Sequence, residues 1–239
     1  MAAEHTDATG GVAGVVAATM RFLQGKRDEA NRNMTAALTR WVRDGVTRTP
    51  APAAGSLEAD VLAVRDAVFR PLGNAVLGSQ WNAAEWPKTL PPFVVALSAL
   101  RVKGPGIDER SIDVARPPAG LPSTLFLSAD DIGYLTRAIA RLGGTLRRDP
   151  ASVMEVPNQP IGAAAEIVRW WDGYFPSRPG HWSGFEIQTY PAFGEVEFTN
   201  AARTRALVPI AVGYSGATAV LEKVNGVWTM KELVNFWIT

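Results

Sequence analysis

The chain has 239 residues, of which 47% are hydrophobic and 20% charged, and this ordinary globular composition excludes a fibrous or wholly disordered protein. Lys and Arg number 24 and Asp and Glu 23, so the net charge of +1 offers no strongly basic surface for nucleic acid. Cysteine is absent, which excludes disulfides, thiolate metal sites and cysteine nucleophiles, and two histidines are too few for a histidine-rich metal site.

The N-terminal sequence bears on location. Glu4 and Asp7 lie where a secretory signal peptide carries positive charge. No apolar run reaches the length of about 18 residues that a membrane span needs. The sequence therefore predicts a cytoplasmic protein without a membrane span, and its frequent Arg and Ala residues are typical of a GC-rich bacterial genome.

The first third of the chain is predicted to be helical. Apolar residues recur at spacings of three and four, which predicts helices over 12–24 and 27–44 with a break at Gly25. A proline-containing linker follows, and Ser56 is the expected N-cap of a third helix that ends near Pro71.

The middle of the chain mixes helix and strand signals. Strands are predicted over 93–102 and 124–127, with a turn at 104–106 between them. Ser128, with Asp131 three residues later, predicts the start of another helix.

The last third begins with a predicted helix over 162–175 and then alternates apolar and polar residues, which indicates β-strands. Ser215-Gly216 is expected to turn, and Asn225-Gly226 is expected to form a two-residue hairpin turn. The last strand is predicted to place one set of apolar residues on a single face: Trp228, Met230, Val234, Phe236 and Ile238.

These elements predict an α+β chain with a helical N-terminal part, a mixed middle, and a C-terminal helix followed by a curved antiparallel sheet. The corresponding segments are 1–50, 56–150 and 155–239. No glycine-rich phosphate loop is present, and no cofactor or metal is predicted. Glu195 and Glu197 share a strand face and are carboxylates that Mg²⁺ or Ca²⁺ accepts, but a solvated strand face explains them as well.

The hairpin Leu221–Lys231, with its Asn-Gly turn and Trp228 on the returning strand, resembles the end of a nuclear-transport-factor-two-like domain. The resemblance covers 155–239 and implies a cystatin-like cone, in which a curved sheet wraps around helices and encloses an apolar cavity. That family includes isomerases, cyclases, dehydratases, hydrolases and non-catalytic subunits, so the fold alone chooses no function.

Aromatic residues crowd the segment 170–182, and they are typical of a core, a partner interface or a ligand pocket. The residues expected to contact a ligand or partner are Trp170, Trp171, Tyr174, Trp182 and Tyr190. His181 has an imidazole suited to acid–base work, and Asp172 or Glu186 could orient it.

These sequence features leave two alternative functions open. The first is a non-catalytic protein-binding or assembly subunit of a bacterial complex, whose partner is another protein or a second copy of this chain. The alternative is a small-molecule enzyme of isomerase, dehydratase or hydrolase type, which uses an apolar cone cavity with His181 as acid or base.

Overall fold

The computed structural model describes residues 11–48, 50–80, 93–117, 123–128, 130–131, 134, 154–156, 170–171, 173–174, 177–179, 185–187, 191–212 and 215–238. Over these residues the chain has an α+β fold, in which helices lead and most strands follow.

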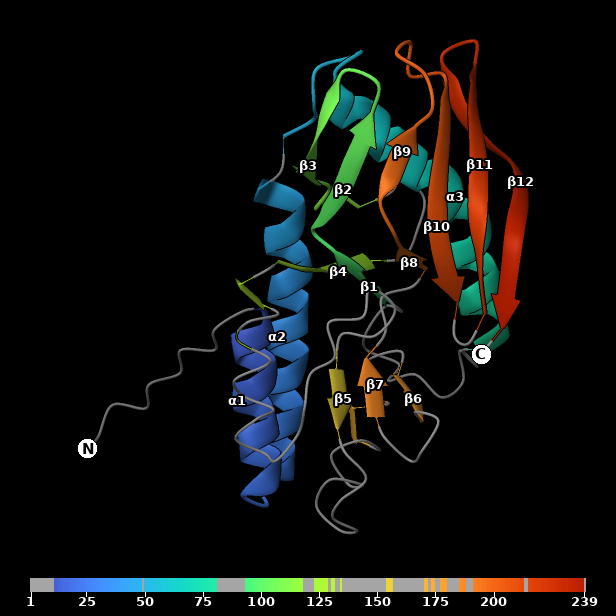
Figure 1. Ribbon diagram of the computed structural model, residues 1–239. Coiled ribbons are helices and arrows are strands. Elements are labelled where there is room, and N and C mark those ends of the chain that lie inside the picture. Colours follow the sequence, from blue (N-terminus) through green and yellow to red (C-terminus); the bar gives the residue numbers. More distant parts are fainter. Residues whose placement is uncertain are drawn as a thin grey trace.

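Two N-terminal helices form an antiparallel hairpin, α1 (Gly11–Leu23) and α2 (Arg27–Arg48) (Figure 1). Gly25 ends α1: it adopts a φ of 76°, and its N–H donates to the Phe22 carbonyl at 2.9 Å. The predicted pair of helices with a break at Gly25 is confirmed.

The third helix, α3 (Leu57–Gln80), begins where the sequence predicts, because Ser56 Oγ accepts the Ala59 N–H at 3.1 Å. The predicted end near Pro71 is wrong, since the helix continues through that proline. Phe69 before it and Leu72 after it both pack into the same core. That packing offsets the hydrogen bond that a proline removes.

The largest sheet has the strand order β12-β11-β10-β9-β2-β3, with β8 also paired to β10. Its strands are β2 (Ala99–Gly104), β3 (Ile107–Asp113), β8 (Ala192–Phe193), β9 (Val196–Phe198), β10 (Arg205–Val212), β11 (Ser215–Val224) and β12 (Val227–Ile238). Neighbours are antiparallel except β2 and β9, which are parallel. The antiparallel meander predicted for the end of the chain is confirmed over β9–β12.

Ser215 and Gly216 belong to β11, so the predicted turn at these two residues is wrong. They pair with Val212 and Ala211 and thereby extend the ladder. The predicted turn at Asn225-Gly226 is confirmed, with φ values of 51° and 81°.

The single strand predicted over 93–102 is also wrong, because the chain changes sheets at Ser98. Before Ser98, β1 (Phe93–Leu97) pairs in parallel with β4 (Ser123–Leu127); after it, β2 joins the large sheet. The Ser98 N–H donates to the Leu127 carbonyl at 2.9 Å, and the Ser98 carbonyl accepts the Val114 N–H at 2.6 Å. A third sheet has the order β5 (Met154–Val156), β7 (Phe185–Ile187), β6 (Ser177–Pro179).

The predicted start of a helix at Ser128 is confirmed by reciprocal capping. The Asp131 N–H donates to Ser128 Oγ at 3.1 Å, and the Ser128 N–H donates to Asp131 Oδ2 at 2.9 Å. Most of that helix, and most of the one predicted over 162–175, lies outside the described residues, although Trp170 and Trp171 are helical.

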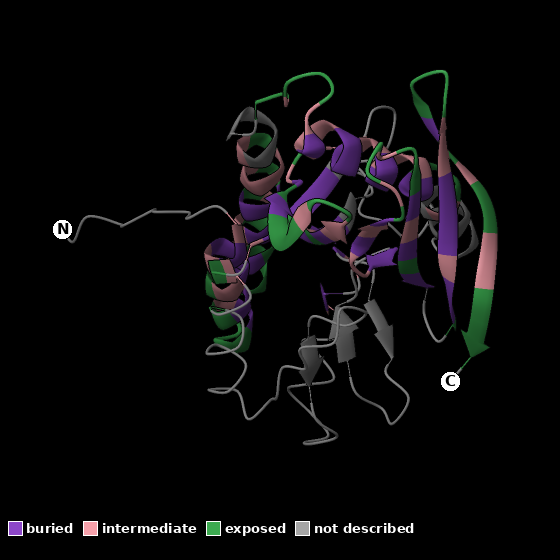
Figure 2. Ribbon diagram, turned by 45° about the horizontal axis from the view of Figure 1, so that its top comes forward, coloured by how far each residue is buried: buried purple, intermediate pink, exposed green. Residues whose placement is uncertain are grey.

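Two hydrophobic cores hold these elements (Figure 2). The first, which we call the sheet core, lies between α3 and the large sheet and includes Val64, Phe198 and Leu221. The second, the helical-hairpin core, joins α1 and α2 to β1, β4 and Trp171. Each core thus draws on distant parts of the sequence: α3 and β2–β3 share the sheet core with β9–β12.

Within β12 the predicted single apolar face is wrong at Val234. Register shifts relative to β11 occur between Val220 and Leu221 and between Gly216 and Thr218. Each shift places an extra residue in β12 and reverses the faces beyond it, so the second shift returns Ile238 to the face of Trp228. Trp228 therefore faces the core, whereas Val234 pairs with Thr218 on the other side of the sheet.

Candidate functional site

The acid–base residues predicted from the sequence are mostly beyond what the structure describes. Glu186 is central in β7, where its backbone pairs with Glu155 and Arg178. Four predicted site residues lie outside the described residues: His181, Asp172, Trp182 and Tyr190. The enzyme hypothesis that depends on His181 stays a prediction.

The other predicted contact residues lie against the N-terminal helices. Trp171 and Tyr174 are buried in the helical-hairpin core, and Trp170 is half-buried. The Trp170 ring stacks on Phe22 with 4.5 Å between centroids, and Tyr174 meets Trp170 edge-on at 5.5 Å. These rings attach the segment 170–174 to α1 and α2.

Their polar groups are used in the same contact. Asn31 Oδ1 accepts hydrogen bonds from Trp170 Nε1 at 2.7 Å and from the Tyr174 hydroxyl at 3.0 Å. Trp171 Nε1 donates to Thr19 Oγ1 at 3.0 Å. Burial raises the pKa of Tyr174, so its hydroxyl keeps the proton that it donates to Asn31.

A buried carboxylate joins the start of α3 to the β11–β12 hairpin. Asp60 Oδ1 accepts from Lys223 Nζ at 2.6 Å and from Trp228 Nε1 at 3.2 Å, and Oδ2 accepts from Arg203 Nε at 2.8 Å. Burial acts to raise the pKa of Asp60, but the hydrogen bonds from Lys223, Arg203 and Trp228 outweigh it and lower that pKa. Asp60 is thus ionised and paired at neutral pH, which suits stabilisation rather than proton transfer.

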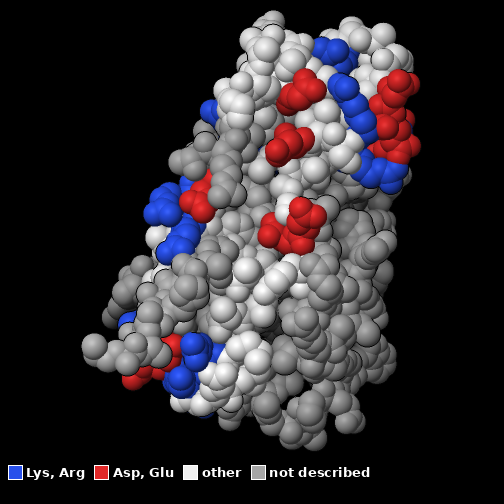
Figure 3. All heavy atoms as spheres, turned by 90° about the vertical axis from the view of Figure 1, so that its left-hand side faces the viewer, with Lys and Arg blue, Asp and Glu red and all other residues white. Residues whose placement is uncertain are grey.

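Charged side chains line the face of the large sheet that α3 does not cover. Lys103 Nζ lies 2.9 Å from Glu195 Oε2 and 3.5 Å from Glu197 Oε2. The hydrogen bond to Glu195 and the two negative charges raise the pKa of Lys103, whose ammonium lies between the two carboxylates considered for a metal. The described residues contain no group of three His, Asp or Glu side chains that could hold a metal ion. Figure 3 shows the side of the molecule that lies at the left of Figure 1, and both basic and acidic side chains occur on it.

Five of the eight exposed large hydrophobic side chains among the described residues lie on the β11–β12 hairpin. Phe236, Trp237 and Ile238, which we call the apolar end, are 71%, 44% and 82% exposed. Val224 and Val227, which we call the valine end, are 47% and 64% exposed beside the turn. Figure 2 shows the C-terminal part of β12 as exposed.

Local geometry explains the apolar end. Trp237 pairs with Gly216, and a Cβ at that glycine would lie 2.1 Å from the indole ring, so only glycine lets the ring lie on the sheet there. Ile238 pairs with Ser215 and projects from the opposite face. The apolar end thus flanks β12 from both faces.

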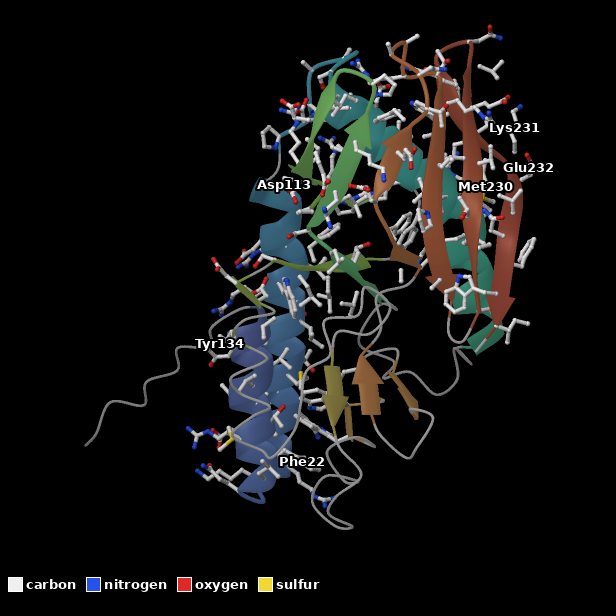
Figure 4. All side chains as sticks on the ribbon, viewed as in Figure 1. Phe22, Asp113, Tyr134, Met230, Lys231 and Glu232 are labelled. Carbon is white, nitrogen blue, oxygen red and sulfur yellow. The ribbon has the colours of Figure 1, made fainter. Side chains whose placement is uncertain are left out.

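Lys231 and Glu232 occupy the middle of β12 and are exposed. Neither side chain forms a hydrogen bond or ion pair with any residue that the structure describes. In Figure 4 both side chains lie at the free edge of β12. Since β12 ends the order of its sheet, this edge has no neighbouring strand among the described ones.

Sequence reasoning placed Phe236 and Ile238 on one strand face with Trp228 and did not predict this exposed surface. The signal was available: Leu233-Val234 and the run 236–238 interrupt the alternation of apolar and polar residues. Adjacent apolar residues within a strand cannot all face one core.

None of the described helices combines the length and hydrophobicity of a membrane span. No protein-family model matches the chain, and no curated protein or solved structure is significantly similar to it.

Proposed function

We propose that this protein is a non-catalytic binding protein, an assembly subunit that joins another protein chain through β12. One observation carries the proposal. Of the eight large hydrophobic side chains exposed among the described residues, five lie on the β11–β12 hairpin.

The amount of apolar surface supports an interface. The apolar end alone offers on the order of 400 Å² of side chain, which is about half of the roughly 800 Å² that one partner contributes to a standard interface. Monomeric proteins rarely expose larger contiguous apolar patches, and such patches are often functional. Aromatic anchors of the Phe236 and Trp237 kind dominate binding energy at interfaces.

The geometry of the edge supports the same function. Unpaired N–H and C=O groups along an edge strand attract a second chain. In β12 those groups lie beside exposed apolar side chains, so a partner can use backbone hydrogen bonds and side-chain packing together.

The experiment is site-specific photocrosslinking in the cells from which the sequence comes. A photoreactive phenylalanine derivative replaces Phe236 in one variant and Ser111 in the control. Ser111 is exposed on β3, the strand at the opposite edge of the same sheet. We expect a protein adduct from position 236 that position 111 does not give.

Equal adducts at both positions, or none at position 236, would contradict a binding role for β12. Mass spectrometry of the adduct identifies the partner chain directly.

A further inference from the structure

We propose that the chain bound at β12 is a second copy of this protein, docked with the two β12 strands antiparallel around a two-fold axis between Lys231 and Glu232. The inference rests on the proposed function, because it names the partner of the same surface.

Symmetry sets the first requirement. A two-fold contact is made by one surface meeting itself, so each pair of residues occurs twice. An axis between Lys231 and Glu232 places Lys231 opposite Glu232 of the partner subunit, and Glu232 opposite the partner's Lys231. Both members are exposed and have no other partner among the described residues, so two ion pairs form without breaking existing ones.

The apolar residues obey the same symmetry. Val227 lies four positions before Lys231, and Phe236 lies four positions after Glu232. The axis therefore brings the valine end of each copy to the apolar end of the other. The irregularity near Asn235, whose φ is 54°, shifts this pairing by about one residue and brings Trp237 within reach as well.

The charges also make the contact selective. Edge strands commonly use a lysine to prevent random strand pairing, because an unmatched charge loses water without compensation. Lys231 disfavours pairing with any strand that has no acidic residue opposite it, whereas a second β12 places Glu232 there. The two bulges interrupt a continuous ladder, so side chains contribute much of the contact.

Surface area and charge fit a dimer. The five exposed side chains of the two ends offer on the order of 500 Å² per copy, against about 800 Å² per partner in a standard interface. A net charge of +1 leaves little long-range repulsion between two copies. Because the contact uses the free edge of β12 in each of the two copies, assembly through this edge stops at two chains.

The test measures mass by sedimentation velocity of the purified full chain, from about 1 to about 100 μM. We expect a dimer for the wild type. Lys231→Glu and Glu232→Lys each place like charges opposite one another twice, and each should weaken dimerisation at least about tenfold. Both positions are exposed, and thermal unfolding checks that the variants stay folded.

Charge reversal provides the matched controls. An equimolar mixture of the two single variants restores opposite charges at both pairs and should form a heterodimer. The double variant Lys231→Glu with Glu232→Lys should again form a homodimer. A wild type that is monomeric at about 100 μM or larger than a dimer, single variants that dimerise like the wild type, or a mixture that does not associate would each overturn the proposal.

The two proposals fail in different ways. A monomeric wild type that still gives a position-236 adduct with a different protein removes the second copy as partner and keeps the binding function. A monomeric wild type without an adduct removes both.

Discussion

Asp60 accepts hydrogen bonds from two cations and an indole, and a single substitution tests how much that arrangement stabilises the fold. Asp60→Asn leaves Lys223 and Arg203 near a neutral group, so we expect a loss of about 2 to 4 kcal/mol in the free energy of unfolding by urea. Asp108→Asn is the control, because Asp108 is exposed on β3 and has no partner among the described residues. A loss no larger than that of the control would show that water replaces these contacts without cost.

The lowered pKa of Asp60 also predicts a pH dependence. A carboxyl whose pKa is lower in the folded than in the unfolded chain stabilises fully above its unfolded value of about 3.9. That contribution disappears as pH falls through the folded value. Between about pH 4 and pH 2 the unfolding free energy of the wild type should therefore fall more steeply than that of Asp60→Asn. Parallel curves for the two proteins would contradict the lowered pKa.

Among the elements, the β11–β12 hairpin depends most on the conformation of its turn. Gly226 has a φ of 81°, which a β-branched residue resists, so Gly226→Val should lower the unfolding free energy by about 1 to 2 kcal/mol or more. Gly226→Asn is the matched control, because asparagine tolerates positive φ. The melting temperature measures both variants, and equal values would exclude a turn effect.

Elements with a local signal were predicted well. Ser56, Gly25 and Asn225-Gly226 mark their boundaries through hydrogen bonds or φ values that neighbouring residues determine. Pro71 and Ser98 mislead because the outcome there depends on distant partners: the sheet core extends α3, and Leu127 and Val114 redirect the chain at Ser98. Strand β3 has no clear apolar alternation and was not predicted at all.

The candidate site illustrates the same limit. The apolar residues at the end of β12 were predicted to share one face with Trp228, which assumes that alternation continues unbroken. The two register shifts with β11 move Val234 to the other face and return Ile238 to the face of Trp228, where it is still 82% exposed. Its exposure follows from the extent of the sheet core, which along β12 reaches Leu233 and no residue beyond it. The positions of Trp170, Trp171 and Tyr174 against α1 and α2 likewise depend on contacts across more than a hundred residues of sequence.

For the whole molecule, the two hydrophobic cores predict two regions of different opening stability. Trp171→Ala removes a large side chain from the helical-hairpin core, and Phe198→Ala removes one from the sheet core. Each should lower the free energy of opening of its own core by about 3 to 5 kcal/mol. Amide hydrogen exchange should then accelerate mainly in α1 and α2 for the first variant and mainly in β10 and β11 for the second. Uniform acceleration throughout the described elements in both variants would instead indicate one cooperative unit.

The order of elements along the chain has a consequence for synthesis on the ribosome. Helix α3 is complete at residue 80, whereas β10, the first long strand of the C-terminal meander, begins at residue 205. At about 5 to 20 residues per second, translation of the intervening chain takes roughly 6 to 25 s. For most of that interval, until β8 and β9 follow at residues 192–198, β2 and β3 are the described strands of the sheet core that have been synthesised to cover α3. We therefore expect the apolar face of α3 to stay accessible in the nascent chain for seconds and to bind ribosome-associated chaperones during that time.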